Sequence, residues 1–263
     1  MQFNHFDIHS HLNLSPLKEN ETEVVARMRE KGVGTITVGV DLDTSREAIA
    51  LAEKYDFVWA TVGLHPTDTV AEQFNFETYK KIAEHPRVVA IGECGLDYFR
   101  DQKEETKSRQ KELFKQQIKL AALVKKPLMI HSRPSKDSMD AYEDALEILE
   151  SYTPQAVNFH FFVGDLTIAK RIFKNGWTVS FDGPITFARD YDEVIRTAPI
   201  DSIMAETDAP FAAPVPHRGK ICEQWMVIEI YKKIAEIRGE DPEIVRQAIL
   251  NNIERVFKIN TLQ

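Results

Sequence analysis

Short apolar runs alternate with longer amphipathic stretches along the whole chain. The runs are rich in β-branched and aliphatic residues, as expected of strands that are buried on both faces of a parallel sheet. They predict strands at residues 3–8, 35–38, 58–62, 88–91, 128–130, 157–159, 178–180 and 202–205.

The amphipathic stretches between these runs have the spacing of helices with one buried face. Glycine and proline mark several helix ends, at Gly32, Pro86, Pro127 and Gly176. The pattern predicts helices at residues 21–31, 45–54, 76–84, 103–125, 138–151, 166–174 and 191–198, followed by two more at 223–238 and 242–257.

Eight strands that alternate with helices over 263 residues predict a single-domain (β/α)8 barrel, regular or distorted, that spans residues 1–263. Such barrels have about 250 residues. A doubly wound open sheet is the alternative fold. For a dinucleotide, that fold requires a glycine-rich GxGxxG turn after the first strand, and the sequence has none there.

Composition and charge narrow the possible functions. The net charge of −8 argues against a general binder of nucleic-acid backbones, which needs a basic face. Bound divalent ions could still attract a nucleic-acid substrate. The two cysteines form no disulfide framework, residues 1–10 lack a signal-peptide pattern, and no apolar run approaches the roughly 20 residues of a membrane helix. We therefore expect a cytoplasmic protein without membrane contact, as a monomer or weak oligomer.

The first predicted strand ends in two histidines that are two residues apart. Alternate residues of a strand face the same side, so His9 and His11 should project together toward the barrel axis. Asp7 should lie beneath or beside them. Imidazoles with this spacing are a natural pair of ligands for one metal ion.

Five further strand ends carry a histidine or a carboxylate where the apolar run gives way to a loop. In a (β/α)8 barrel, active sites are built from residues at this end of several different strands. A histidine packed in the core explains any one of these positions, but it does not explain their recurrence. The residues are His65, Glu93, His131, His160, Glu206 and Asp208.

Three other histidines lack this placement. His5 lies in or before the first strand, and His85 ends a helix, where a cation interacts favourably with the helix dipole. We expect both to have structural or surface roles. His217 lies on a long loop after the last strand and is a weaker candidate for contact with a substrate.

The motifs resemble those of a known family, the TatD-type deoxyribonucleases, which belong to the amidohydrolase-like metallo-dependent hydrolases. The resemblance covers essentially the whole chain, with all blocks in order. A lone HxH motif is weak evidence, whereas five blocks in register are specific. The blocks are DIHSH at 7–11, GLHP at 63–66, IGECGLDY at 91–98, HSR at 131–133 and ETDAP at 206–210.

The resemblance implies a distorted barrel with a two-metal centre. His9 and His11 would bind one divalent ion together with Asp208, whereas His131 and His160 would bind the other. Glu93 would bridge the two ions. The family is similar to Mg²⁺-dependent 3′–5′ exonucleases that act on DNA, some of which also cleave at abasic sites. Some members have been described as deacylases of D-aminoacyl-tRNA.

Several residues are expected to assist catalysis beside the metal ligands. A carboxylate such as Asp208 can also accept a proton from the attacking water. His65 is the best candidate for a catalytic group that is not a ligand, either protonating the leaving oxygen or hydrogen-bonding the phosphate. Asp7 and Glu206 are expected to support the ligands. Glu206 would orient a histidine, or else it would form a salt bridge with Arg133 or Lys220.

Basic and aromatic residues in the same loops are candidates for substrate contact. Arg133 presents a planar fork that matches a phosphate, and Arg100, Arg218 and Lys220 are expected near it. The segment at 97–99 contains Tyr98, which we expect to offer an aromatic face to a base. An acidic body with basic groups at its mouth favours a protein that holds the ends of DNA strands.

The sequence departs from the family pattern in three places. Val163 stands where serine or threonine is common, and Cys94 stands where an aliphatic residue is usual. The stretch at 221–224 reads ICEQ in place of an Asn-Glu-Pro segment. None of these changes removes a predicted metal ligand, but the last could alter substrate preference.

Two alternatives remain open from the sequence. The same ligands would serve a hydrolase of an amide, ester or aminoacyl-tRNA, because a metal ion polarises carbonyl and phosphoryl groups alike. A metal-binding protein without catalysis would need the ligands but not His65. Metal identity is also open: mixed histidine and carboxylate ligands suit Zn²⁺ or Mn²⁺ at least as well as Mg²⁺.

Overall fold

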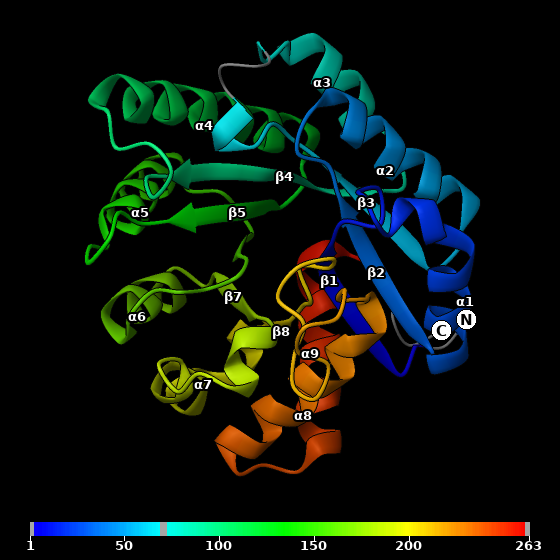
Figure 1. Cartoon of the computed structure of the whole chain (residues 1–263). Coiled ribbons are helices and arrows are strands. Elements are labelled where there is room, and N and C mark those ends of the chain that lie inside the picture. The colour runs from blue at the N-terminus through cyan, green and yellow to red at the C-terminus, as the bar shows by residue number, and fades with distance from the viewer. Residues whose placement is uncertain (1–2, 69–72, 261–263) are drawn as a thin grey trace.

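The computed structural model describes residues 3–68 and 73–260 and contains one parallel sheet of eight strands in sequence order (Figure 1). This order and the alternation with helices confirm the predicted barrel. The strands are β1 (His5–Ser10), β2 (Val33–Val38), β3 (Val58–Val62), β4 (Val88–Asp97), β5 (Leu128–Arg133), β6 (Val157–Phe159), β7 (Thr178–Phe181) and β8 (Ile203–Ala205).

The helices lie outside the ring of strands (Figure 1). They are α1 (Glu21–Lys31), α2 (Leu42–Lys54), α3 (Phe76–Ala83), α4 (Glu104–Val124), α5 (Asp140–Tyr152), α6 (Leu166–Lys174), α7 (Asp192–Thr197), α8 (Val227–Arg238) and α9 (Pro242–Phe257). None of the described helices is long and apolar enough to cross a membrane.

Element boundaries differ from the prediction where polar residues continue a regular backbone. Strand β4 runs on to Asp97 and β5 to Arg133, because ladder hydrogen bonds do not depend on the polarity of the side chains. Helix α2 begins three residues early, where Asp41 and Thr44 form a capping box. The expected start of the helix at 223–238 contains the short 3₁₀ segment Gln224–Met226.

The ring is joined between its first and last strands beside the predicted metal ligands. Ser10 and Ala209 form a parallel bridge, and the amide of Asp208 donates to the carbonyl of His9 at 2.9 Å. The buried carboxylate of Asp7 accepts hydrogen bonds from the amide and hydroxyl of Thr207 at 2.9 and 2.6 Å. Asp7 therefore joins β1 to the end of β8, next to the predicted ligands.

Two of the strand pairings, β1–β2 and β4–β5, shift register at positions where metal ligands are predicted. The β1–β2 pairing shifts between Asp7 and Ser10, a span that contains His9. The β4–β5 pairing shifts between Ile91 and Cys94, a span that contains Glu93. Irregularities of this kind re-aim side chains next to active sites.

Glycines on both sides of Glu93 allow β4 to run close to β5. Gly92 and Gly95 have φ angles of 156° and 138°, which favour glycine. A Cβ atom on Gly95 would lie 2.0 Å from the carbonyl oxygen of His131, and one on Gly92 would lie 2.5 Å from that of Met129. No larger residue fits at either position without moving β5.

His5 gives the fold a measurable dependence on pH. Burial, assisted by the positive charges of Arg246 and Lys232, lowers the pKa of its imidazole from 6.5 to about 4. In the unfolded chain His5 therefore binds a proton at a higher pH than in the folded chain. The stability tied to neutral His5 is present above pH 6.5 and is lost as the pH falls toward 4.

Replacement of His5 by Gln should reduce the acid sensitivity of the fold. The wild type should lose up to about 3 kcal/mol more than H5Q between pH 6.5 and 4, as measured by urea denaturation. All other titrating groups are common to both proteins and cancel in the difference. Parallel losses of stability in the two proteins would contradict this prediction.

Candidate metal centre

The strand ends bring the predicted ligands together at the carboxyl end of the barrel. They lie in or around a cavity of about 560 Å³. The cavity is lined by residues from seven strand ends or the loops after them, among them His11, His65, Glu93, His131, His160 and Asp208. His9 lies directly behind this wall and is fully buried.

One half of the site consists of the two histidines of β1 and a carboxylate after β8. The Nε2 atoms of His9 and His11 are 3.3 Å apart. Oδ1 of Asp208 lies 3.7 Å from the former and 3.3 Å from the latter. Asp208 has a φ angle of 54°, a left-handed conformation that is uncommon outside glycine and is concentrated at functional sites.

The carboxylate of Glu93 lies between this half and a second group of imidazoles. Its Oε2 faces His9 and His11 at 3.5 and 3.9 Å. Its Oε1 lies 2.8 Å from both Nδ1 of His131 and Nε2 of His160. Each oxygen of one carboxylate therefore faces a different group of nitrogen donors.

The outer nitrogen of each predicted ligand faces a hydrogen-bond acceptor. His11 Nδ1 lies 3.3 Å from the carbonyl of Val38, and His9 Nδ1 lies 3.1 Å from the sulfur of Met129. His160 Nδ1 lies 3.3 Å from Glu206, and His131 Nε2 lies 3.1 Å from Asp97. A proton on each outer nitrogen leaves the inner nitrogen with its lone pair toward the centre of the site. Metal-binding histidines commonly have this arrangement.

His65 differs from these histidines because its outer nitrogen accepts a hydrogen bond. The amide of Thr67 donates to Nδ1 of His65 at 3.2 Å, so in the neutral ring the proton resides on Nε2. That nitrogen faces Oε1 of Glu93 at 3.4 Å. Hydrogen-bond partners thus favour His65 as a proton donor in the site, although His65, Glu93 and His131 are also close enough together to hold an ion.

The electrostatic field of the site favours cations. Burial alone would disfavour the charged form of Glu93, but the imidazoles of His160, His65 and His131 outweigh it and hold its pKa well below the usual range. Burial is likewise outweighed at His160, where Glu93 and Glu206 raise the pKa well above its usual value. A field that stabilises protonated imidazole also stabilises a bound metal ion.

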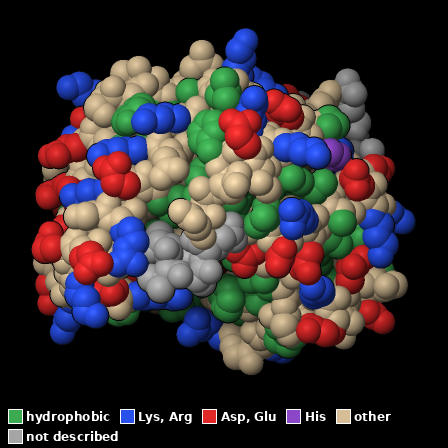
Figure 2. Space-filling view, turned by 90° about the horizontal axis from the view of Figure 1, so that it is seen from above, with side chains coloured by type: hydrophobic (Ala, Val, Ile, Leu, Met, Phe, Trp, Pro, Cys, Tyr) green, Lys and Arg blue, Asp and Glu red, His purple; other side chains and the backbone are tan. Residues whose placement is uncertain are grey.

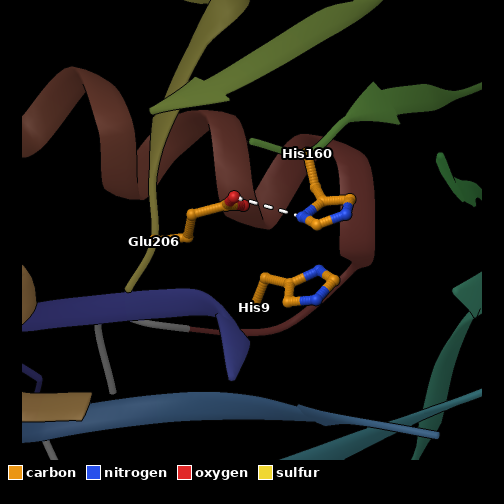
Figure 3. Close-up of side chains that lie close together, drawn as sticks. All are labelled: His9, His160 and Glu206. Carbon is orange, nitrogen blue, oxygen red and sulfur yellow. Dashed lines mark hydrogen bonds and ion pairs between the residues drawn. The ribbon is translucent and has the colours of Figure 1, made fainter. Parts of the chain in front are cut away.

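Glu206 lies behind His160 and His9 and could itself hold an ion with them (Figure 3). Both of its oxygens are already engaged, however. The amide of Phe161 donates to Oε1 at 2.6 Å, and the hydroxyl of Ser180 donates to Oε2 at 2.6 Å. Glu206 therefore fits the predicted role of orienting a histidine better than that of a ligand, and its partner is His160 rather than Arg133 or Lys220.

Asp97 is a participant that the sequence analysis did not identify. Its buried carboxylate anchors His131 through Oδ2 and accepts the amides of Phe99 and Arg100 through Oδ1, both at 3.1 Å. The available signal was the spacing from Glu93, because residues four apart in one strand share a face. That signal required β4 to extend beyond residue 91.

Tyr98 does not contact the cavity, and the prediction that it binds substrate is wrong. The side chain is fully buried, and its hydroxyl donates to Asp144 at 2.8 Å. The alternation of a strand points Tyr98 away from the face that carries Asp97. The neighbouring Phe99 is exposed instead, with the guanidinium of Arg133 over its ring at 4.1 Å.

The basic residues at the mouth divide into two groups. Arg100 and Arg133 line the cavity, as expected of groups that contact a substrate. Arg218 instead lies over the ring of Phe187 at 3.9 Å, and His217 packs edge-on against Trp225.

Two of the three departures from the family pattern, at 221–224 and at Val163, lie at positions with a definable structural role. Cys222 and Gln224 are buried, and the side-chain Nε2 of Gln224 donates to the hydroxyl of Ser10 at 3.2 Å. Glu223 forms an ion pair with Arg27 at 2.6 Å, so the stretch at 221–224 fastens the last loop to β1 and α1. Val163 lines the cavity and gives it a small apolar area.

Asp97→Asn should weaken metal binding at the centre. The side-chain amide that replaces the carboxylate can still contact His131 but carries no negative charge. Loss of such a partner of a metal-binding histidine typically lowers metal affinity 10–100-fold. Zn²⁺ and Mn²⁺ titrations followed by calorimetry would measure the change. D137N is the matched control, since Asp137 is exposed in the loop after β5. Equal affinities in D97N and D137N would contradict the anchoring role.

Comparisons with known proteins identify the family of this chain. The family model described as TatD related DNase matches residues 6–258. A Bacillus subtilis (strain 168) protein, the uncharacterized metal-dependent hydrolase YabD, is 37% identical, with 97% of this chain and 99% of the relative covered. The uncharacterized metal-dependent hydrolase YcfH of Escherichia coli (strain K12) is 32% identical, with 97% and 96% covered.

A solved structure has the same fold along its whole length. The crystal structure of YjjV, a TatD homologue from Escherichia coli K12, superposes with a TM-score of 0.88 at 27% identity. The superposition covers 99% of this chain and 100% of that one. The chain belongs to the TatD family of metal-dependent hydrolases.

Proposed function

We propose that this protein is a deoxyribonuclease that hydrolyses phosphodiester bonds at the 3′ ends of DNA strands with two divalent metal ions. The observation that carries the proposal is the position of Glu93, whose two oxygens face two separate groups of imidazoles. The description of the matching family supports DNA as the substrate.

Each half of the centre offers ligands for one ion. His9, His11 and Asp208 would hold the first ion, whereas His131 and His160 would hold the second. Glu93 would contribute one oxygen to each. Two bound ions lower the pKa of a water molecule and stabilise the charge on both oxygens of the displacement. The donor set accommodates Zn²⁺ or Mn²⁺ as well as Mg²⁺.

Asp208 and His65 would transfer protons in this reaction. Asp208 is buried, which disfavours its charge, but His11 and His9 outweigh burial and lower its pKa. Asp208 is therefore ionised near neutral pH and able to accept the proton of the attacking water. His65 would donate a proton from Nε2 to the leaving oxygen. The amide of Thr67 donates to Nδ1 of His65, so the proton of the neutral ring resides on Nε2.

The mouth of the cavity suits the end of one strand better than the side of a duplex. A cavity of about 560 Å³ is in the size range of small-ligand sites, and Arg133 and Arg100 are the cations that line it. On the outer face shown in Figure 2, acidic and basic side chains are interspersed. The described residues of that face form no broad basic path for a duplex.

The first test is nuclease activity on single-stranded DNA labelled at the 3′ or the 5′ end. Stepwise shortening from the 3′ end with Mg²⁺, Mn²⁺ or Zn²⁺ is the expected result. Chelation should abolish activity, and addition of a divalent ion should restore it. Absence of cleavage with every ion, while metal remains bound, would favour an amide, ester or aminoacyl-tRNA substrate.

Glu93→Ala and Asp208→Ala should each reduce turnover by at least about 10³-fold, because each removes a ligand of the centre. Circular dichroism should show an intact fold, and metal analysis should show lower occupancy. E84A is a matched control for E93A, since Glu84 is an exposed carboxylate at the end of α3. Full activity of E93A or D208A would refute the two-metal assignment.

A further inference from the structure

Phe211 is a large apolar side chain that the fold leaves exposed inside the functional cavity. Its exposed fraction is 54%, and it lines the cavity beside Asp208. Burial of a phenylalanine side chain stabilises a fold, and Phe211 forgoes much of this stabilisation. Its position therefore calls for an explanation in terms of a ligand.

The loop that carries Phe211 is fastened at several points. The amide of Phe211 donates to the carbonyl of Asp208 at 2.9 Å, and the amide of Cys222 donates to the carbonyl of Pro210 at 3.1 Å. Four residues later, the amide of Val215 donates to Thr186 at 2.9 Å. The exposed ring is thus presented by an ordered loop, which lowers the entropic cost of binding against it.

The loop also packs tightly against the segment that follows β7. A Cβ atom on Gly183 would lie 1.7 Å from the carbonyl oxygen of Ala212, so the two backbones touch. This close contact fixes the backbone of the residue next to Phe211.

The surroundings of Phe211 match the two chemical parts of a nucleotide. Its ring meets the ring of His11 at an angle of 66°, with 6.3 Å between centroids, so it lies next to the metal ligands. The same cavity is lined by Arg100 and Arg133. An aromatic ring and two cations in one cavity offer a surface for a base and charges for a phosphate.

Two other exposed phenylalanines near the mouth differ from Phe211. Phe99 carries the guanidinium of Arg133 over its ring, and Phe187 carries that of Arg218. Those rings position arginines through cation–π contacts. Phe211 instead contacts the ring of His11, a predicted metal ligand, within the cavity itself.

We propose that Phe211 is the platform on which the base of the 3′-terminal nucleotide stacks while its phosphodiester bond lies at the metal centre. This inference rests on the proposed nuclease function and specifies its substrate: a terminal nucleotide that carries a base and is unpaired. Stacking is tolerant of sequence, so all four bases should be accepted. A paired terminal base must first separate from its partner.

The test compares two single-stranded oligonucleotides that differ only in the 3′-terminal residue, which is either a thymidine or an abasic tetrahydrofuran. Wild-type protein should remove the thymidine with a kcat/KM about 5–150-fold higher, the range expected from one stacked base. F211A should remove both residues equally well, and F211Y should retain the preference. F187A is the matched control and should behave as the wild type.

The outcomes separate this inference from the proposed function. If wild-type protein shortens the oligonucleotides and F211A keeps the full preference for the base, the stacking platform is wrong and the nuclease function stands. If wild-type protein shortens neither oligonucleotide with Mg²⁺, Mn²⁺ or Zn²⁺, the nuclease function is wrong and the platform falls with it. Circular dichroism and metal content of F211A verify that fold and centre are intact.

Discussion

The structure depends on one buried carboxylate whose charge is compensated by its neighbours. Glu93 lies inside the barrel mouth, where an isolated carboxylate would be expensive to ionise. His131 and His160 contact one of its oxygens, and His9 and His11 face the other. The histidines in turn gain a counter-charge. A buried carboxylate and buried protonated imidazoles are each costly alone, and each compensates the charge of the other. This compensation favours the arrangement in which the strands bring Glu93 and the histidines to a common point.

The hydrogen bond at the outer nitrogen of each imidazole determines whether its inner nitrogen carries a lone pair or a proton. A carbonyl or carboxylate at the outer nitrogen turns the inner lone pair toward the centre, as at His11, His131 and His160. A backbone amide at the outer nitrogen of His65 reverses this polarity and leaves a proton on the inner side. Residues of the same type thus acquire different chemistry from their acceptors and donors, which lie on other strands and loops.

The sequence allowed correct predictions where the structure follows from the spacing of apolar and polar residues. Alternating strands and helices predicted the barrel, and polar residues at strand ends predicted the convergence of His9, Glu93 and His160. The predictions failed where the outcome depends on register and packing. The extension of β4 buries Tyr98 and turns Asp97 toward His131, and a four-residue apolar run carries no sign of this. The shifts in pairing at His9 and Glu93 likewise arise from contacts between strands that are distant in sequence.

The junction between β1 and β8 gives the metal centre a mechanical role. His9 and His11 lie on one side of this junction and Asp208 on the other, close to the Ser10–Ala209 bridge and the Asp7–Thr207 hydrogen bonds. An ion held by all three ligands would span the junction and add its binding free energy to the cost of local opening there. Amide hydrogen exchange along β1 and β8 would then report metal occupancy, even in a protein that is given no substrate.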